Sequence, residues 1–253
     1  MNKKPTLNVL SIDFDFFQTV DAKTMVDCYP DGIDLPPQIT TFTWAGHYTG
    51  TCGKQVNNIT CPTQDIDTVL DCIKANADHV LTCEAYCSHV HIFDMIFDHY
   101  DIHNYENIHI LNLDMHHDFQ NDNSELDCGN WLSHVKRDCP NAKIQWITRP
   151  TALELYNLTE PNLPIHTDLK ILKDFQPDLI FVCRSDTWFP PHLDPYFDTF
   201  IKELQALFPD NCYIEPAIQV PRNFALIQKQ VDQLEAFSRL PFTTSKHNQH
   251  SLT

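Results

Sequence analysis

The stretch IHILNLDMHHD, running from Ile108 to Asp118, decides how this chain of 253 residues is organised. Its first part, Ile108 to Leu113, is an apolar run typical of a buried strand. Asp114, His116 and Asp118 follow at alternate positions, and alternate side chains of an extended segment lie on one side. Carboxylate oxygen and imidazole nitrogen are ligands that manganese, iron and zinc accept. We therefore expect a metal site beyond this strand; the alternative is a polar strand exit without metal.

A second strand-like segment lies near the N-terminus, where residues 8–17 read NVLSIDFDFF. Asp13 and Asp15 stand at alternate positions in it, although aspartate is disfavoured in strands and is rarely buried. Two aspartates among Val, Leu, Ile and Phe need a counter-charge, and a metal ion supplies one. An edge strand with its polar side in water is the alternative.

The composition bounds the class of protein. A hydrophobic share of 42% allows a full core, and the length suits one substantial α/β domain. The formal net charge of -17 argues against a nucleic-acid partner, because phosphate binding needs clustered Lys and Arg. A negative field attracts a cationic substrate or peptide, although solubility alone explains it equally well.

No signal-peptide pattern and no apolar run of membrane-spanning length stand out, so the sequence predicts a cytosolic protein without a membrane partner. In that compartment the 10 cysteines are most simply reduced thiols.

Strand-like and helix-like patterns alternate along the chain. Further strands are expected over 79–83, 143–148, 178–183 and 212–218, and helices over 18–27, 65–77, 88–99, 127–137, 152–158, 195–208 and 222–238. This alternation predicts one three-layer α/β/α domain over residues 1–243 with a mostly parallel sheet, followed by a flexible tail over 244–253. Ligands of such sheets bind beyond the carboxyl ends of the strands, where the acidic motifs lie.

Residues 28–64 differ from their surroundings because they are rich in Pro, Gly, Thr and Asn. Turn chemistry dominates such a stretch, and a loop of this length in a compact domain is commonly functional or mobile. We expect an insertion or lid with Trp44 and His47 as substrate contacts; a surface excursion without function is the alternative.

The motifs LDMHHDF and SIDFD resemble the D-x-H-x-D and S-x-D-x-D motifs of the ureohydrolase (arginase-like) superfamily, which hold two manganese ions. The resemblance implies an arginase-like fold and a metal ligand set consisting of Asp13, Asp15, His89, Asp114, His116 and Asp118. Asp13 and Asp114 would bridge the ions, Asp15 and His116 would complete one site, and Asp118 and His89 the other. His89 lacks the family's usual G-D-H context. The order of the two motifs is reversed relative to ordinary arginases, as in a circular permutation.

The early SIDFDFF, the CGNW segment and RSDTWFPPHL resemble the group that contains peptide arginases, which convert arginine residues of a precursor peptide to ornithine and release urea. The resemblance implies an arginine-containing precursor peptide as partner and two Mn²⁺ as cofactors. We expect Glu84 to hold the guanidinium, and Arg184 with Asp186 to grip the substrate backbone or termini. An ordinary salt bridge is the alternative for that pair.

Proton transfer to the departing amine is assigned to His134, with His117 as the alternative and Asp118 as a second catalytic group, because an imidazole titrates near neutral pH. The preferred expectation for His117 is that it points to the opposite side of the strand and supports the ligands or packs.

Three other functions stay open. The chain could hydrolyse a free guanidino compound such as arginine or agmatine. It could also be a metal-binding protein without catalysis that recognises a cationic peptide. A deacetylase-like reaction on acylated lysine with a single zinc is the third.

Overall fold

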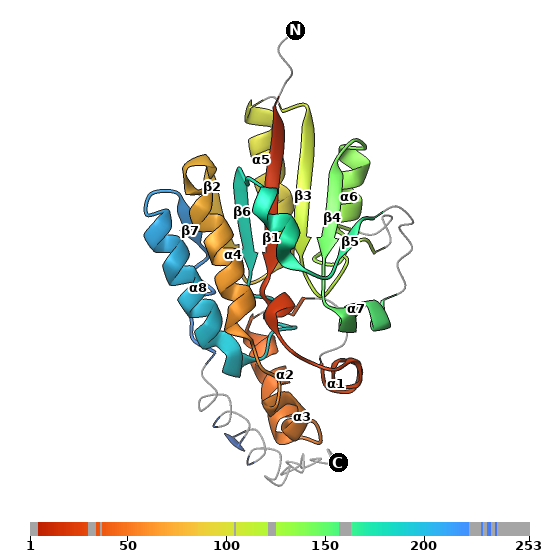
Figure 1. The fold of residues 1–253 in the computed structure, drawn as a ribbon. Helices are drawn as coiled ribbons and strands as arrows, with labels where there is room; N and C mark the ends of the chain where they lie inside the picture. The colour runs from red at the N-terminus through yellow and green to blue at the C-terminus, as the bar shows by residue number, and fades with distance from the viewer. Residues whose placement is uncertain are drawn as a thin grey trace, which may run out of the picture.

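The computed structural model describes residues 5–29, 34–35, 37–103, 105–120, 125–156 and 163–222, together with isolated positions between 229 and 236. Its centre is a seven-stranded sheet in the order β5-β4-β3-β1-β6-β2-β7 (Figure 1). The strands are β1 (Thr6–Asp13), β2 (Thr82–Tyr86), β3 (Asn107–Leu113), β4 (Lys143–Ile147), β5 (Ile165–His166), β6 (Leu179–Cys183) and β7 (Cys212–Ile214). Every pairing between neighbouring described strands is parallel. All carboxyl ends therefore lie at one edge.

The apolar runs in the sequence explain which strands lie in the middle. β1 pairs with β3 on one side and with β6 on the other, and β6 is buried along its whole length. A strand that is covered on both faces needs apolar side chains at consecutive positions. LIFVC in β6 meets this requirement along its whole length, and β1 meets it at Val9 and Leu10, with Ile12 following.

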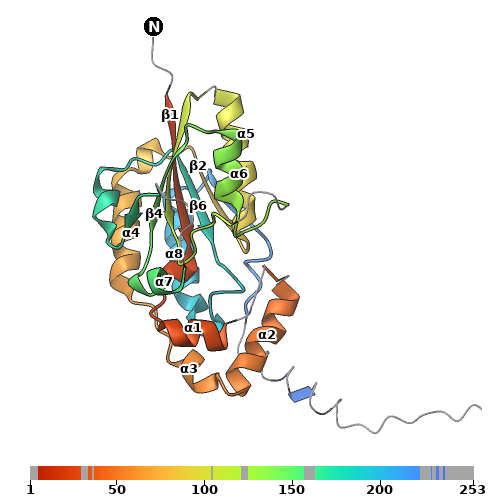
Figure 2. The ribbon, with the colours of Figure 1, turned by 90° about the vertical axis from the view of Figure 1, so that its right-hand side faces the viewer.

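Helices cover both faces of the sheet (Figure 2). α4 (Thr63–Ala75) and α8 (Asp194–Leu207) bury their apolar stripes on one face. α5 (Ile92–His103) and α6 (Trp131–Asp138) pack on the other. The expected single α/β/α fold is confirmed, and the sheet is parallel throughout the described strands.

The stretch expected to be a loop insertion is largely helical. It contains α2 (Pro37–Thr49) and α3 (Gly53–Asn57), and α1 (Ala22–Cys28) precedes them. Trp44 of α2 is fully buried and donates a hydrogen bond from Nε1 to the carbonyl of Asp186 at 2.8 Å. The prediction is wrong here because burial of aromatic side chains outweighs the turn-forming composition.

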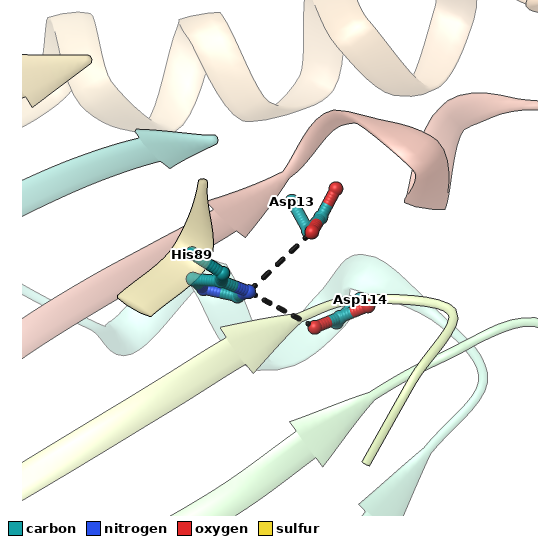
Figure 3. A group of neighbouring side chains, drawn as sticks. All are labelled: Asp13, His89 and Asp114. Carbon is teal, nitrogen blue, oxygen red and sulfur yellow. Dashed lines mark ion pairs between the residues drawn. The ribbon is translucent and has the colours of Figure 1, made fainter. Parts of the chain in front are cut away.

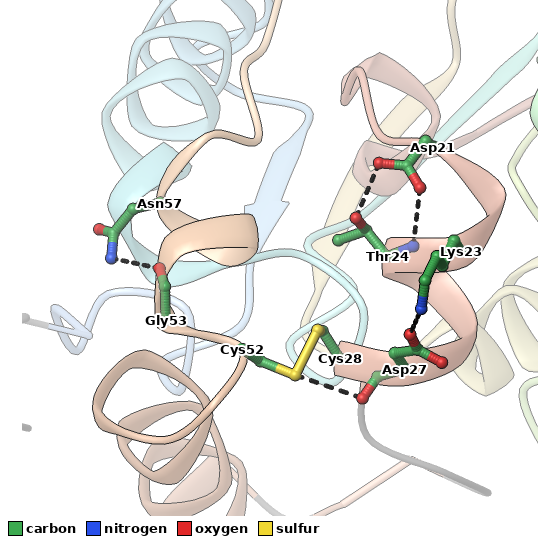
Figure 4. The surroundings of a disulfide bond; sticks show 8 residues. All are labelled: Asp21, Lys23, Thr24, Asp27, Cys28, Cys52, Gly53 and Asn57. Atoms are coloured by element: carbon green, nitrogen blue, oxygen red, sulfur yellow. Dashed lines mark hydrogen bonds and ion pairs between the residues drawn. A yellow bond between two sulfur atoms is a disulfide. The ribbon is translucent and has the colours of Figure 1, made fainter.

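A disulfide bond between Cys28 and Cys52 links α1 to the residue that precedes α3 (Figure 4). The prediction of reduced thiols is therefore wrong for these two cysteines. The other eight are free.

Elsewhere the expected and observed elements agree to within a few residues. α7 (Pro150–Leu155) replaces the helix expected over 152–158, and the strand expected over 212–218 ends at Ile214. The expected C-terminal helix and the tail fall mostly or wholly outside the described residues. No helix in the described part of the chain is both long and apolar enough to cross a membrane.

Candidate metal centre

Two neighbouring strands at the centre of the sheet deliver the first aspartates. Asp13 ends β1, and Asp114 comes directly after β3. Ile12 pairs with Leu113 in the sheet, so the next residue of each strand lies at the same level. His89 belongs to a short 3-10 turn that follows β2, and its side chain points at both carboxylates (Figure 3). The parallel fold thus brings distant acidic motifs to one edge of the sheet.

The first group of ligand-type side chains surrounds one nitrogen of His89. Its Nδ1 lies 3.4 Å from Oδ2 of Asp13, 3.3 Å from Oδ2 of Asp114 and 3.2 Å from Oδ2 of Asp118. A single N–H can serve only one of these oxygens well. Three carboxylates and an imidazole nitrogen that converge in this way match the donor set of a divalent cation.

The second group shares Asp114 with the first. His116 Nδ1 lies 3.1 Å from Oδ2 of Asp15 and 3.5 Å from Oδ1 of Asp114. The Oδ2 atom of Asp15 is buried and has no hydrogen-bond partner among the described residues, although it lies close to that imidazole. One oxygen of Asp114 therefore faces each histidine, which is the arrangement of a carboxylate that bridges two ions. We call Asp13, Asp15, His89, Asp114, His116 and Asp118 the ligand cluster.

The side chains converge through turns and not through the expected extended alternation. Asp15 lies in a 3-10 turn over Phe14–Phe17. Asp13 caps the start of this turn, because its Oδ1 accepts a hydrogen bond from the backbone N–H of Asp15 at 3.1 Å. The residues after β3 leave the strand, and Asp118 has a φ of 51°. A non-glycine residue in this left-handed region is uncommon and is typical of functional sites.

Neighbouring polar groups fix the orientation of the ligand cluster. Ser11 Oγ lies 2.6 Å from His89 Nε2, and this contact leaves Nδ1 directed at the carboxylates. Trp131 Nε1 donates to Oδ2 of Asp118 at 2.6 Å. Asn112 Nδ2 approaches both Asp114 and Asp118, at 3.4 and 3.5 Å. Such outer partners hold metal-binding side chains in place and set the histidine tautomer.

The carboxylates and imidazoles shift one another's pKa. Burial, followed by the charges of neighbouring carboxylates, raises the pKa of Asp15 well above its usual value. Burial also opposes ionisation of Asp114, but hydrogen bonds and charges of the two histidines outweigh it and lower its pKa. Burial disfavours the imidazolium of His89, yet the surrounding carboxylates outweigh burial and raise its pKa well above the usual value. Four carboxylates against two imidazoles leave an excess of negative charge that a cation relieves.

The donor set, rich in carboxylates, fits manganese. Carboxylate oxygens suit magnesium, calcium and manganese, and imidazole nitrogen suits zinc, copper, iron and nickel. Two groups that could each hold a metal ion share Asp114: Asp13, His89 and Asp114 form the first, and Asp15, Asp114 and His116 the second.

A pocket opens over the ligand cluster. Besides four of its members, the lining residues are Asp34, Gln120, Asp127, Cys128, Gly129, Cys183, Ser185 and Trp188. Asp34 was not expected here, because it stands in the Pro- and Gly-rich stretch without any motif. Burial raises its pKa above the usual value. Among the described residues, none that lines this pocket is a lysine or an arginine.

Two of the other expected site residues, Glu84 and His134, lie away from this pocket. Glu84 is within β2, and its carboxyl is close to Tyr86, Asp98 and His91. His134 is buried in α6, where its ring packs edge-on against Phe93. Neither lines the pocket, so the structure does not place Glu84 against a substrate or His134 beside the ligand cluster.

Arg184 and Asp186 are buried and pair with each other, with Arg184 Nη2 donating to Asp186 Oδ2 at 2.9 Å. This geometry matches the alternative of an ordinary salt bridge. His47 contacts the ring of the buried Trp44, and neither residue lines the pocket. His117 packs against Trp146, as expected for a residue that points away from the metal.

No protein-family model, curated protein or solved structure matches this chain.

Proposed function

We propose that this chain is a binuclear manganese hydrolase that converts arginine residues of a precursor peptide to ornithine and urea. The observation that carries the proposal is the pair of ligand triads that share Asp114, whose two oxygens face His89 and His116. A bound pair of divalent ions lowers the pKa of water, so that a nucleophile for the unreactive guanidinium carbon exists at neutral pH. In the balanced reaction, alkylguanidinium and water give alkylammonium and urea.

The residues of the chain contribute binding, orientation and proton transfer. Asp118 lines the pocket and its Oδ2 is held by Trp131, so its carboxylate is placed to take the proton of the attacking water and pass it to the departing amine. The packing of the Trp188 ring against His116, with 4.8 Å between centroids, closes one side of the pocket. The described lining of the pocket contains no lysine or arginine that would repel a guanidinium.

Two features support a peptide as substrate. The first is the resemblance of CGNW and RSDTWFPPHL to peptide arginases. The second is the net charge of -17, which favours association with a cationic peptide. Incubation with manganese and an arginine-containing precursor peptide should give a product lighter by one CH₂N₂ unit for each arginine converted, with an equal amount of urea. Turnover of free arginine or agmatine with no change in the peptide would favour a hydrolase of free guanidino compounds instead.

Asp114→Asn tests the metal centre because it removes charge from the one carboxylate that both triads share. We expect the wild type to bind two manganese ions per chain and the variant to lose both ions and urea release. Asp198→Asn on the exposed side of α8 is the matched control, and it should retain metal and activity. An Asp114→Asn protein that releases urea without bound metal would contradict the proposal. A wild type that binds manganese but releases no urea from any arginine-bearing compound would indicate a binding protein.

A further inference from the structure

Asp34 is held between two strand-exit loops that border the pocket. Its Oδ2 accepts a hydrogen bond from the hydroxyl of Ser88, the residue directly before His89. The next residue, Leu35, donates from its backbone amide to Oγ1 of Thr187 at 3.0 Å, in the loop after β6. Two anchors from different loops fix Asp34 in the pocket that opens over the ligand cluster.

No lysine or arginine among the described residues balances the charge of Asp34. Its hydrogen-bond partners are the neutral groups of Ser88 and Cys128. The nearest charges that act on it are those of Asp13, which is also anionic, and of His89. The four carboxylates of the ligand cluster would be neutralised by two divalent ions, and His89 would then be a neutral ligand. Asp34 would remain a mostly buried anion without a counter-ion.

A mostly buried carboxylate without a counter-ion is costly, and a cation bound beside it offsets that cost. We infer that Asp34 holds the cationic head group of the substrate in the pocket over the ligand cluster, an inference that rests on the proposed function. Asp34 is then the residue that selects a positively charged side chain, the role expected from sequence for Glu84.

The test uses a cationic probe that the chain cannot hydrolyse. Nα-acetyl-lysine amide carries a positive head group, and Nα-acetyl-norleucine amide is its neutral counterpart of nearly the same length. Binding of each to the manganese-loaded protein is measured by calorimetry for the wild type, Asp34→Asn, Asp34→Glu and Asp127→Asn. Asp127→Asn is the matched control, because it removes the same charge from the same pocket. Manganese stoichiometry is measured for each protein.

We expect the wild type to prefer the cationic probe by roughly 10- to 100-fold, the range that a charge-assisted hydrogen bond supplies. Asp34→Asn should abolish this preference with two manganese ions still bound. Asp34→Glu should restore part of it, and Asp127→Asn should keep most of it. Equal loss in both asparagine variants would mean that the field of the pocket selects the cation, and would overturn the role of Asp34. The role of Asp34 would also be overturned if the Asp34→Asn protein still preferred the cationic probe, or if it no longer bound manganese.

The outcome separates this inference from the hydrolase proposal. Selective binding that depends on Asp34, without urea release from any arginine-bearing compound, would sustain the inference and overturn the hydrolase. Urea release from a peptide by an Asp34→Asn protein with unchanged KM and kcat would sustain the hydrolase and overturn the inference.

Discussion

Two buried clusters of charge lie beyond the carboxyl ends of the central strands, and they differ in how the charge is balanced. In the ligand cluster, four carboxylates face two imidazoles. The second cluster consists of Arg184, Asp186, Asp194 and Arg222, which we call the arginine cluster. Two guanidinium groups meet two carboxylates there, and backbone carbonyls accept the remaining N–H groups, as when Arg222 donates to Phe189 at 2.8 Å.

The comparison distinguishes the charges of the arginine cluster, which stabilise the fold, from those of the ligand cluster, which we propose bind cations. The arginine cluster is complete by itself, and it joins the loop after β6 to the start of α8. The ligand cluster has two more carboxylates than imidazoles, and we propose that bound cations balance them. Buried ions are tolerated when they are paired and hydrogen-bonded. The arginine cluster meets this condition within the chain, and the ligand cluster would meet it with bound cations.

Manganese should therefore stabilise the protein, and this is the largest effect that we expect. At a free concentration 100 times the dissociation constant, each occupied site adds about 2.7 kcal/mol to the free energy of unfolding, so two sites add about 5 kcal/mol. Denaturant unfolding with and without manganese measures the gain. Asp114→Asn should lose it, and Asp198→Asn should keep it. If manganese left the wild-type unfolding midpoint unchanged, the ligand cluster would not be a metal site.

Asp186→Asn should lower the free energy of unfolding by about 3–5 kcal/mol, because it leaves a buried guanidinium without its partner. The loss should be the same with and without manganese, since the arginine cluster needs no ion. Exposed Asp198→Asn should change stability by less than about 0.5 kcal/mol. A loss for Asp186→Asn that manganese reverses would show that the two clusters are coupled and would break the comparison.

The effect of Asp186→Asn should depend on pH in a defined direction. Burial opposes ionisation of Asp186, but the charges of Arg222 and Arg184 outweigh it and lower its pKa. A carboxyl with a lowered folded-state pKa stabilises fully above its unfolded pKa of about 3.9 and loses that contribution as pH falls through the folded value. The difference between variant and wild type should stay constant from neutral pH to about pH 5 and shrink only below about pH 4. Unfolding curves across this range measure it, and a difference that already shrinks near pH 6 would contradict the assignment.

Ser11→Ala should give the smallest effect, a loss of manganese affinity of about 10- to 100-fold, because the hydroxyl orients the imidazole of His89. Calorimetric titration with manganese measures it. Ser133→Ala on α6 is the control, since that hydroxyl bonds only to the carbonyl of Gln120 among the described residues. Equal affinities for wild type and Ser11→Ala would mean that packing alone holds the ring of His89.

The sequence indicated most of the fold, because strands buried on both faces require consecutive apolar residues. The meeting of Asp13 with Asp114 followed from two apolar runs that end in acidic residues at the same edge of a parallel sheet. Their local geometry did not follow, since alternation assumes extended backbone and Asp118 has a positive φ. The periodicity of apolar residues in a sequence does not indicate where a residue adopts a left-handed backbone conformation.

The wall of the pocket was not predictable in the same way. Glu84 was expected to hold the substrate because it stands near a strand exit. It lies inside β2, on the side of the sheet that α5 covers, and cannot reach the carboxyl edge. Asp34 reaches the pocket through bonds to Ser88 and to the loop after β6, both far away in sequence. Only the tertiary fold reveals such a contact.

The position of β1 has a consequence for how the protein is made. β1 is the first strand to be synthesised, yet it lies in the middle of the sheet, and its neighbours β3 and β6 begin only at Asn107 and Leu179. A nascent chain that has just completed β1 holds Asp13 and Asp15 without any of their partners. Any metal that the ligand cluster holds would therefore be acquired only after the closure of a long loop, a slow step for a fold rich in non-local pairings.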